Sequence, residues 1–308
     1  MSKFPKLKGK AVLAPMAGVT DIAFRELCIR YGASLTYTEM INATAILHKN
    51  KATEKLLQVS SKEKPVAVQL FGNNAEEIAS AAEIIGKKFD IIDINCGCPV
   101  DKVTKIGAGC ALMEKPDKIK EIIEKTIAKI KKPVTIKIRA GIDENHINAV
   151  KIAKIAEKAG ASAVCIHART QKQGYSGKTD WDLIKKVKES VKIPVIGNGD
   201  IFSPEDFAQK LKFSNVNYIM IGRGAIGNPI IFKQINDFLQ KGKYEKDVDK
   251  KKLFLEYLKL AIKYKIDFKQ IKNQAIYFTK GTQGGAKLRM AITRAKNITE
   301  IKEILKKT

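Results

Sequence analysis

The sequence lacks any long hydrophobic run. No apolar stretch in its 308 residues approaches the roughly 20 residues that a membrane-spanning helix needs. The first segment, MSKFPKLKGKAVLAP, is positively charged but has only a short apolar run, unlike a secretory signal peptide. We therefore expect a cytoplasmic protein that does not enter a membrane.

Cysteine is also scarce. Five cysteines, an odd number, in a chain without secretory features predict reduced thiols and not a disulfide framework. Cys28 lies in a helical pattern and Cys165 in mid-strand, so both are expected in the core. The pair in IDINCGCPVDK (91–101) lacks the C-x-x-C spacing of common zinc sites, and no second Cys/His pair follows. We therefore expect no metal site.

What the chain does contain is a repeated unit of strand, turn and helix. Short β-branched apolar runs recur, most of them followed by a polar or glycine-rich turn and a helical pattern such as 75–88 or 148–160. Ser203 and Pro204 form a helix start, with Ser203 as N-cap. The predicted strands are 11–18, 34–40, 65–72, 89–97, 133–141, 163–169, 194–201 and 218–225.

Eight such units predict an α/β fold, a (β/α)₈ TIM barrel, over residues 1–236. A doubly wound open sheet is the alternative. We favour the barrel because the count reaches eight and no strand is followed by a dinucleotide-type G-x-G-x-x-G.

The last quarter of the chain differs in character. Residues 237–308 hold 19 Lys/Arg and 8 Asp/Glu, a net charge of +11 in 72 residues, whereas residues 1–236 hold 38 and 24, a net of +14. The patterns KKKLFLEYLKLAIKYK and ITEIKEILKK are helical. We predict a small, basic, all-α C-terminal domain over residues 237–308.

The total net charge of +25 has two interpretations. One is a lysine-rich, solvated surface, and the other is a polyanionic partner, with nucleic acid first. Charge alone does not choose between them, so the choice depends on the site.

Polar or glycine-rich groups end every predicted strand, at the face where TIM barrels carry their chemistry. They are Pro15, Met16 and Ala17; Glu39; Gln69; Asn95; Lys137 and Arg139; His167 and Arg169; Asn198, Gly199 and Asp200; and Gly222, Arg223 and Gly224. A set that converges on one mouth is hard to explain as solvation alone.

The last two strand ends predict a phosphate site. The turns GNGD and GRGAIGNP hold glycines that let a phosphate approach the backbone, and Arg223 could pair with it. The alternative is two tight turns that need glycine only for positive φ. Lys137 and Arg139 alternate with isoleucines and so share one side of a strand, where two cations would need an anionic ligand.

Cys98 lies beyond its strand, on the loop where catalytic groups belong, whereas Cys96 directly after the strand could serve packing. Proton donation or nucleophilic attack suits Cys98 best.

Several motifs together resemble the tRNA-dihydrouridine synthase family. They are APMAGVTDIAFRELC (14–28), VQLFG (68–72), DINCGCPVDKVTKIGAGCALM (93–113), IKIRAG (136–141), IHARTQKQGYSGKTDWDLI (166–184), VIGNGDI (195–201), IMIGRGAIGNP (219–229) and, more weakly, GAKLRMAITRAK (285–296). The resemblance implies an FMN enzyme that reduces the C5=C6 bond of particular uridines in tRNA, with NADPH or NADH as electron donor.

The resemblance also implies residue roles. Cys98 matches the catalytic cysteine, which protonates C5 after hydride reaches C6, and Asn95 and Arg169 match positions near the uracil. We add Arg139 to the substrate set, and Lys287, Arg289, Arg294 and Lys296 as contacts to tRNA phosphates. The flavin-binding matches are Pro15, Met16, Ala17, Gln69, Lys137, His167, Asn198, Gly199, Asp200, Gly222 and Arg223.

Two rival functions stay open: an FMN barrel acting on a free pyrimidine, and an RNA-binding barrel without catalysis. The first needs no basic helical tail, and the presence of Cys98 and Lys137 argues against the second. No obligate protein partner is evident. We expect Cys98 to be largely protonated at neutral pH, although nearby helix N-termini lower thiol pKa values.

Overall fold

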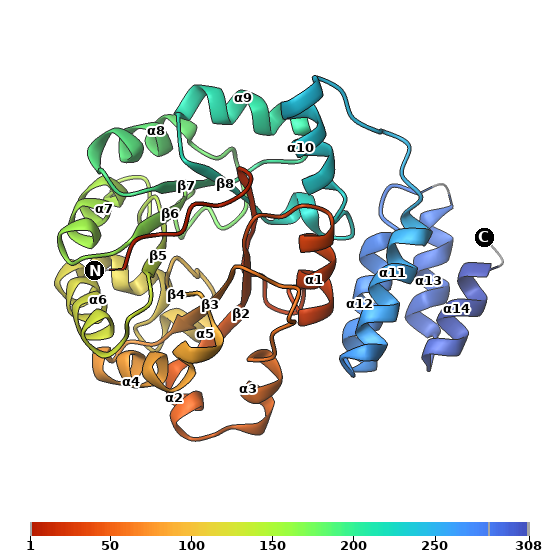
Figure 1. The fold of residues 1–308 in the computed structure, drawn as a ribbon, viewed down its shortest axis with the longest axis horizontal. Helices are drawn as coiled ribbons and strands as arrows, with labels where there is room; N and C mark the ends of the chain where they lie inside the picture. Colours follow the sequence, from red (N-terminus) through yellow and green to blue (C-terminus); the bar gives the residue numbers. More distant parts are fainter. Residues whose placement is uncertain (1, 283, 307–308) are drawn as a thin grey trace.

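Eight parallel strands form a barrel, and each falls within or overlaps one of the eight predicted runs (Figure 1). The structure is a computed structural model that describes residues 2–282 and 284–306. The strands are β1 (Ala11–Leu13), β2 (Thr36–Asn42), β3 (Val66–Phe71), β4 (Ile91–Cys96), β5 (Val134–Arg139), β6 (Ala163–His167), β7 (Val195–Asn198) and β8 (Tyr218–Ile221).

The sheet closes on itself. Its strands are hydrogen-bonded in the order β1-β8-β7-β6-β5-β4-β3-β2. Two backbone bonds of 2.9 Å link β1 to the residues that enter β2: the N–H of Leu13 donates to the carbonyl of Leu35, and that of Ser34 donates to the carbonyl of Ala11. The (β/α)₈ barrel is confirmed, and the open doubly wound sheet is excluded.

Helices surround the barrel. They are α1 (Ile22–Arg30), α2 (Ala43–Leu47), α3 (Lys51–Leu56), α4 (Ala75–Ile85), α5 (Asp101–Thr104), α6 (Pro116–Lys129), α7 (Ala149–Lys158), α8 (Trp181–Ser190), α9 (Pro204–Ser214) and α10 (Ile231–Lys241), with short 3₁₀ turns η1 (Gly86–Lys88), η2 (Gly109–Glu114) and η3 (Arg223–Ala225). The predicted start of α9 is confirmed: Ser203 accepts from the N–H of Asp206 in a capping box, and Pro204 follows it.

Strand β4 shows how the sequence places polar groups inside the barrel. Ile92, Ile94 and Cys96 belong to the large core between strands and helices, whereas Ile91 lies in a smaller core inside the barrel. Because side chains alternate along a strand, Asp93 and Asn95 face inward like Ile91. Cys96 is thus the last residue of the strand and not the first after it, and it is a buried packing residue.

A bundle of four helices follows the barrel, as predicted. The helices are α11 (Lys250–Lys263), α12 (Phe268–Phe278), α13 (Gly285–Arg294) and α14 (Ile298–Lys306). The bundle lies beside α1, with α14 farthest from the barrel (Figure 1). The expected boundary between residues 236 and 237 falls inside α10, which packs on α9 and β1. The change in charge density therefore precedes the structural junction, which is the connection 242–249.

Tyrosine hydroxyls join the bundle to α1. Tyr257 donates to Asp21 at 2.9 Å, and Tyr31 donates to Glu256 at 2.9 Å. Tyr264 donates to Glu26, whose side chain is fully buried. Burial alone would raise the pKa of Glu26, but hydrogen bonds from Ser60, Tyr264 and Arg30 lower it to about 2.

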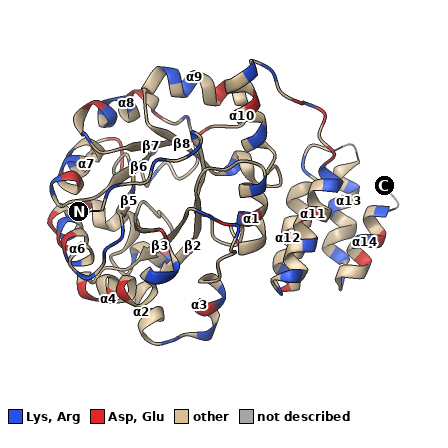
Figure 2. Cartoon of the chain, viewed as in Figure 1, with Lys and Arg blue, Asp and Glu red and all other residues tan. Residues whose placement is uncertain are grey.

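Lys and Arg residues are distributed over the bundle and over the outer helices of the barrel alike (Figure 2). Across the described part of the chain, no helix is both long enough and apolar enough to span a bilayer.

Candidate active site

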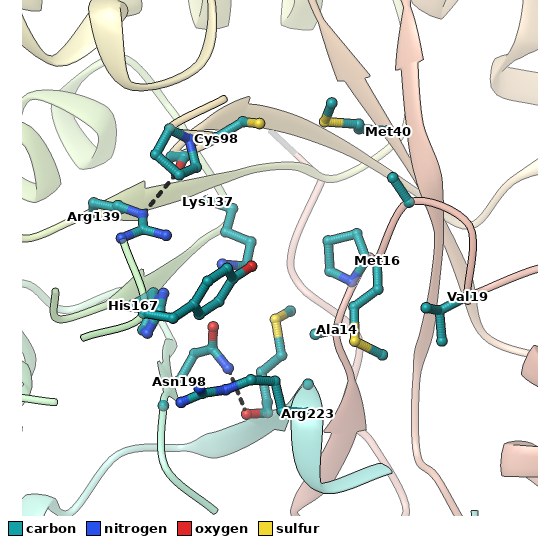
Figure 3. Close-up of a pocket in the computed structure, with 18 of the residues that line it drawn as sticks. Ala14, Met16, Val19, Met40, Cys98, Lys137, Arg139, His167, Asn198 and Arg223 are labelled. Carbon is teal, nitrogen blue, oxygen red and sulfur yellow. Dashed lines mark hydrogen bonds between the residues drawn. The ribbon is translucent and has the colours of Figure 1, made fainter. Parts of the chain in front are cut away.

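A cavity of about 420 Å³ opens at the carboxyl ends of the strands. Figure 3 shows one wall with Cys98, Arg139, Lys137, His167, Asn198 and Arg223, and an opposite wall with Met40, Met16, Ala14 and Val19. The cavity thus has one polar and one largely apolar wall, an arrangement that suits a flat heteroaromatic ligand. The predicted site residues that line it are Pro15, Met16, Ala17, Gln69, Asn95, Cys98, Lys137, Arg139, His167, Asn198, Gly199, Asp200, Gly222 and Arg223.

Cys98 lies on the loop between β4 and α5, partly exposed to the cavity. Burial raises the pKa of its thiol above the ordinary value, against the opposing effects of the Val100 N–H, Arg139 and Lys137. The thiol is therefore protonated at neutral pH, as expected, and can act as an acid.

Two cations enter the cavity from β5. The Arg139 guanidinium is held by the protein, because it donates to the carbonyls of Gly97 at 3.0 Å, Thr170 at 2.8 Å and Gly174 at 2.7 Å. The Lys137 ammonium forms no hydrogen bond or ion pair with any residue that the structure describes. A half-buried ammonium without a partner indicates that a ligand with acceptor atoms belongs beside it.

His167 ends β6 as a neutral imidazole. Burial lowers its pKa to about 2, and Lys137, Arg139 and Arg169 act in the same direction. Its Nε2 accepts from Arg169 at 3.3 Å, which assigns the ring proton to Nδ1. His167 can therefore offer a neutral N–H donor to a ligand.

Arg169 does not line the cavity but lies behind it, buried. Its guanidinium donates to Asp200 at 2.8 and 3.0 Å, to Thr179 at 2.8 Å, and to the carbonyls of Ser176 and Gly177 at 3.0 and 2.6 Å. With these partners, Arg169 holds the loop after β6 against the turn after β7. The structure does not place Arg169 in the cavity, although a residue that contacts a uracil would have to lie there.

The turns after β7 and β8 are built closely enough to require glycine. Gly199 has φ +131°, and a Cβ there would lie 2.2 Å from the Thr179 hydroxyl. A Cβ on Gly224 would lie 2.1 Å from the carbonyl of Ile201, so the two turns press together. Arg223 reaches back from the second turn to Asp200 at 2.8 Å.

Asp200 forms ion pairs with both Arg169 and Arg223. Burial would raise its pKa, but Arg169 and the Thr179 N–H outweigh this and lower it. Asp200 is therefore ionised, and it orients the Arg223 guanidinium at the cavity.

Gln69 and Asn95 are buried beneath Cys98. The Asn95 amide nitrogen donates to the Gln69 side-chain oxygen at 2.7 Å, and the Asn95 oxygen accepts from the N–H of Cys98 at 2.9 Å. The Asn95 side chain therefore hydrogen-bonds to Gln69 on one side and to the Cys98 loop on the other, and these contacts are all with other protein groups.

Two exposed aromatic residues at the mouth were missed by sequence reasoning. Tyr175 and Phe202 are 62% and 54% exposed and both line the cavity. The Arg223 guanidinium lies 5.1 Å from the Tyr175 ring centre and 5.5 Å from that of Phe202. Tyr175 lies between Gly174 and Gly177 in QKQGYSGKTDW, and its place in this glycine-containing loop is the sequence feature that could have indicated an exposed aromatic residue at the mouth.

Helix α12 borders the mouth from the bundle. Gln274 donates to the carbonyl of Val19, a cavity residue, at 2.8 Å. The backbone of Gly227 lies so close to Tyr277 that a Cβ would be 2.3 Å from its carbonyl oxygen. The bundle therefore contacts the loops after β1 and β8, next to the cavity.

The predicted tRNA contacts lie away from the cavity, on and just after α13. Lys287, Arg294 and Lys296 are exposed, whereas Arg289 is partly buried and donates to the carbonyl of Thr279 at 3.2 Å. Met290, 60% exposed, lies between Lys287 and Arg294 in the helix and is their neighbour on its outer face.

Within the described ranges, 2–282 and 284–306, no three His, Cys, Asp or Glu side chains are grouped so that they could hold a metal ion.

Comparison with known proteins identifies the chain's relatives. The family model described as dihydrouridine synthase (Dus) matches residues 12–308. The chain belongs to the dihydrouridine synthase family.

Curated relatives of this chain span most of its length. The tRNA-dihydrouridine synthase B of Shewanella oneidensis is 43% identical over 238 residues, covering 77% of this chain and 74% of the relative. A probable tRNA-dihydrouridine synthase of Aquifex aeolicus is 38% identical over 303 residues, covering 96% and 94%. A solved structure of a morphinone reductase mutant in complex with tetrahydroNAD shares the fold, with TM-score 0.57, 12% identity and coverage of 78% and 89%.

Proposed function

We propose that this chain reduces the C5=C6 bond of particular uridines in tRNA to 5,6-dihydrouridine, with FMN as cofactor. The observation that carries the proposal is a protonated thiol, Cys98, in one cavity with Lys137, a cation that no described residue pairs. The names of the curated relatives point to the same substrate.

The residues of the cavity fit a flavin mononucleotide. Its volume, about 420 Å³, lies in the range typical of small-molecule sites. The apolar wall with Met16 and Ala14 suits one face of a ring system, and Lys137 suits the ring edge where a reduced flavin carries negative charge. Gln69 has a second amide N–H for the same edge.

The phosphate end would lie at the turns after β7 and β8. Arg223, held by Asp200, supplies a guanidinium there, and the backbones of Gly199 and Gly222 are the proposed contacts beside it. His167 adds a neutral donor from β6. The remaining contacts that we propose for the cofactor are Pro15, Met16, Ala17, Asn198 and the backbone of Asp200.

Cys98 is proposed as the general acid. When bound, FMN supplies the hydride that adds to C6 of the uracil, and NADPH or NADH is the proposed source of its electrons. Cys98 holds the second hydrogen as a proton on Sγ and delivers it to C5, so that one bond is saturated by one hydride and one proton. The resulting thiolate regains its proton from solvent. Arg139, next to the Cys98 loop, is the proposed contact to the base.

The bundle is proposed to hold the tRNA. Lys287, Arg294 and Lys296 form an exposed cationic group, Arg289 adds a partly buried one, and phosphates neutralise such groups with release of counterions. The target base must leave its stack to reach a cavity inside the barrel mouth.

The decisive experiment uses purified protein loaded with FMN, NADPH and an unmodified tRNA transcript. Digestion and mass spectrometry would find uridines heavier by about two hydrogens, from the one hydride and one proton added. Cys98→Ala is expected to lose this product while retaining bound flavin.

Other outcomes decide between functions. Oxidation of NADPH with every uridine unchanged, together with turnover of free uracil or dihydroorotate, would replace the proposal with a free-pyrimidine enzyme. A protein that binds tRNA but cannot take up FMN would indicate an RNA-binding barrel without catalysis.

A further inference from the structure

A buried carboxylate lies inside the barrel beneath the cavity. Asp93 of β4 is fully buried, and neither of its oxygens reaches the cavity surface. Thr135 donates to one oxygen at 2.5 Å, and the Gln69 amide nitrogen donates to the other at 2.7 Å. Burial raises the pKa of Asp93 to about 6, and the hydrogen bonds from Gln69 and Thr135 oppose this.

These bonds continue to the catalytic loop. The Gln69 side-chain oxygen, on the far side of its amide from Asp93, accepts from the Asn95 amide nitrogen at 2.7 Å. The Asn95 oxygen then accepts from the N–H groups of Gly97 at 3.1 Å and Cys98 at 2.9 Å. A single chain of hydrogen bonds therefore runs from Asp93 to the backbone of Cys98.

The order of donors and acceptors in this chain is set at its buried end. The Asp93 oxygen that faces Gln69 can only accept, whether or not a proton lies on the oxygen facing Thr135. Gln69 must then turn its nitrogen toward Asp93 and its oxygen toward Asn95. Asn95 in turn must place its oxygen against the two N–H groups of the loop.

We infer that Asp93 is a positioning residue for Cys98, which acts through the amides of Gln69 and Asn95 and touches neither cofactor nor uracil. The inference rests on the proposed function for its meaning in catalysis. Without an acceptor at Asp93, the Gln69 amide can reverse, and the loop then loses the acceptor that holds its two N–H groups. A donor displaced by about 1 Å can cost on the order of 100-fold in rate.

The test uses three variants of the full-length protein. Asp93→Leu removes the acceptor at similar volume. Asp93→Asn keeps an oxygen for Gln69 and lets the new nitrogen donate to the Thr135 hydroxyl, so it should rescue the loop. Thr135→Val is the matched control, because it removes the other partner of Asp93 and leaves the bond to Gln69.

The first measurement is the rate of iodoacetamide alkylation of Cys98, followed by mass spectrometry on folded protein without tRNA. The other four cysteines are buried, and Cys98→Ala gives the background. Asp93→Leu is expected to speed alkylation several-fold, on the order of fivefold, because a loosened loop exposes the thiol. Asp93→Asn and Thr135→Val should alkylate within about twofold of wild type, since both keep the acceptor.

The second measurement separates chemistry from binding. In Asp93→Leu we expect kcat for dihydrouridine formation to fall about 10- to 100-fold, with KM for tRNA and flavin content little changed. A folded Asp93→Leu protein with wild-type alkylation and wild-type kcat would overturn the inference. If Asp93→Leu does not fold, Gln69→Leu interrupts the same chain one residue later, and wild-type alkylation there would overturn it equally.

The alkylation result does not depend on the substrate. If wild type forms no dihydrouridine, the proposed function fails, while the change in Cys98 reactivity still shows whether Asp93 positions the loop.

Discussion

The cavity and the α13 surface use charge in opposite ways. Around the cavity, Arg139 and Arg169 are nearly inaccessible and each makes several hydrogen bonds to fixed partners. On α13, by contrast, the side chains of Lys287 and Arg294 are exposed to solvent. A buried charge that lacks hydrogen-bond partners costs stability, so each buried guanidinium needs a full set of partners. Exposed charges are screened by solvent and salt, so each contributes little by itself and the total number of them matters. Single substitutions should therefore have large effects in the cavity and small ones on α13.

The largest effect is expected at Cys98. Replacing it by serine leaves a hydroxyl that is a far weaker acid than a thiol, so dihydrouridine formation should fall by about 10²- to 10⁴-fold. Flavin absorbance and the thermal midpoint should stay near wild type. Cys96→Ala, two residues away, is the control: it should lower stability slightly through packing and leave activity intact. Similar activity losses in both variants would contradict the assignment of the acid.

The next effect is expected at Arg169. Arg169→Met removes the donors to two carbonyls and to Asp200, which should cost about 3 kcal/mol of unfolding free energy, at the low end for a buried pair because Asp200 is partly exposed. The Asp200–Arg223 pair loses its support, so FMN affinity should fall as well. Chemical denaturation and flavin titration measure both. Lys55→Met, from an exposed ion pair with Asp267, should change neither.

Asp21, at the junction of barrel and bundle, should have a smaller and pH-dependent effect. Burial raises its pKa to about 6 from 3.8, so the ionised form is disfavoured in the folded protein, and stability falls as pH rises through that interval. Asp21→Asn keeps the N-cap and a partner for Tyr257 but cannot ionise. It should be more stable than wild type by about 1–3 kcal/mol at pH 7.5.

At pH 4, where wild-type Asp21 is mostly protonated, the difference between the two proteins should shrink toward zero. Thermal unfolding at both values measures this. A gain of equal size at pH 4 and pH 7.5 would show that ionisation of Asp21 is not its cause.

The smallest effects are expected on α13. Lys287→Ala and Arg294→Ala should each weaken tRNA binding a few-fold and reduce the slope of log affinity against log salt by about 1. Lys8, exposed just before the amino end of β1 on the opposite face of the barrel, provides a control that should leave the slope unchanged. Equal slopes for all three variants would place the tRNA elsewhere. Fluorescence titration at several salt concentrations distinguishes these results.

Much of the fold followed from local pattern. Short, largely apolar runs rich in β-branched residues and followed by turns, such as β4, indicate strands covered on both faces. Ser203 with Pro204 marks a helix start by chemistry that needs no tertiary contact. The end of α10 did not follow, because charge density changes at residue 237 while the helix continues to Lys241 on packing against α9. Local composition does not record where packing stops.

The sequence by itself determined the eight strands, the family, and the set of polar residues that meet at the barrel mouth, since strand alternation and strand ends are local properties. Only the tertiary structure decided what each polar group bonds to. It turned Arg169 away from the cavity toward Asp200, bonded Asn95 to the Cys98 loop, and placed Tyr175 and Phe202 beside Arg223. The physical reason is that hydrogen bonds of 3 Å join residues far apart in the chain, such as Gln69 and Asn95 at 2.7 Å, and no spacing in the sequence encodes that distance.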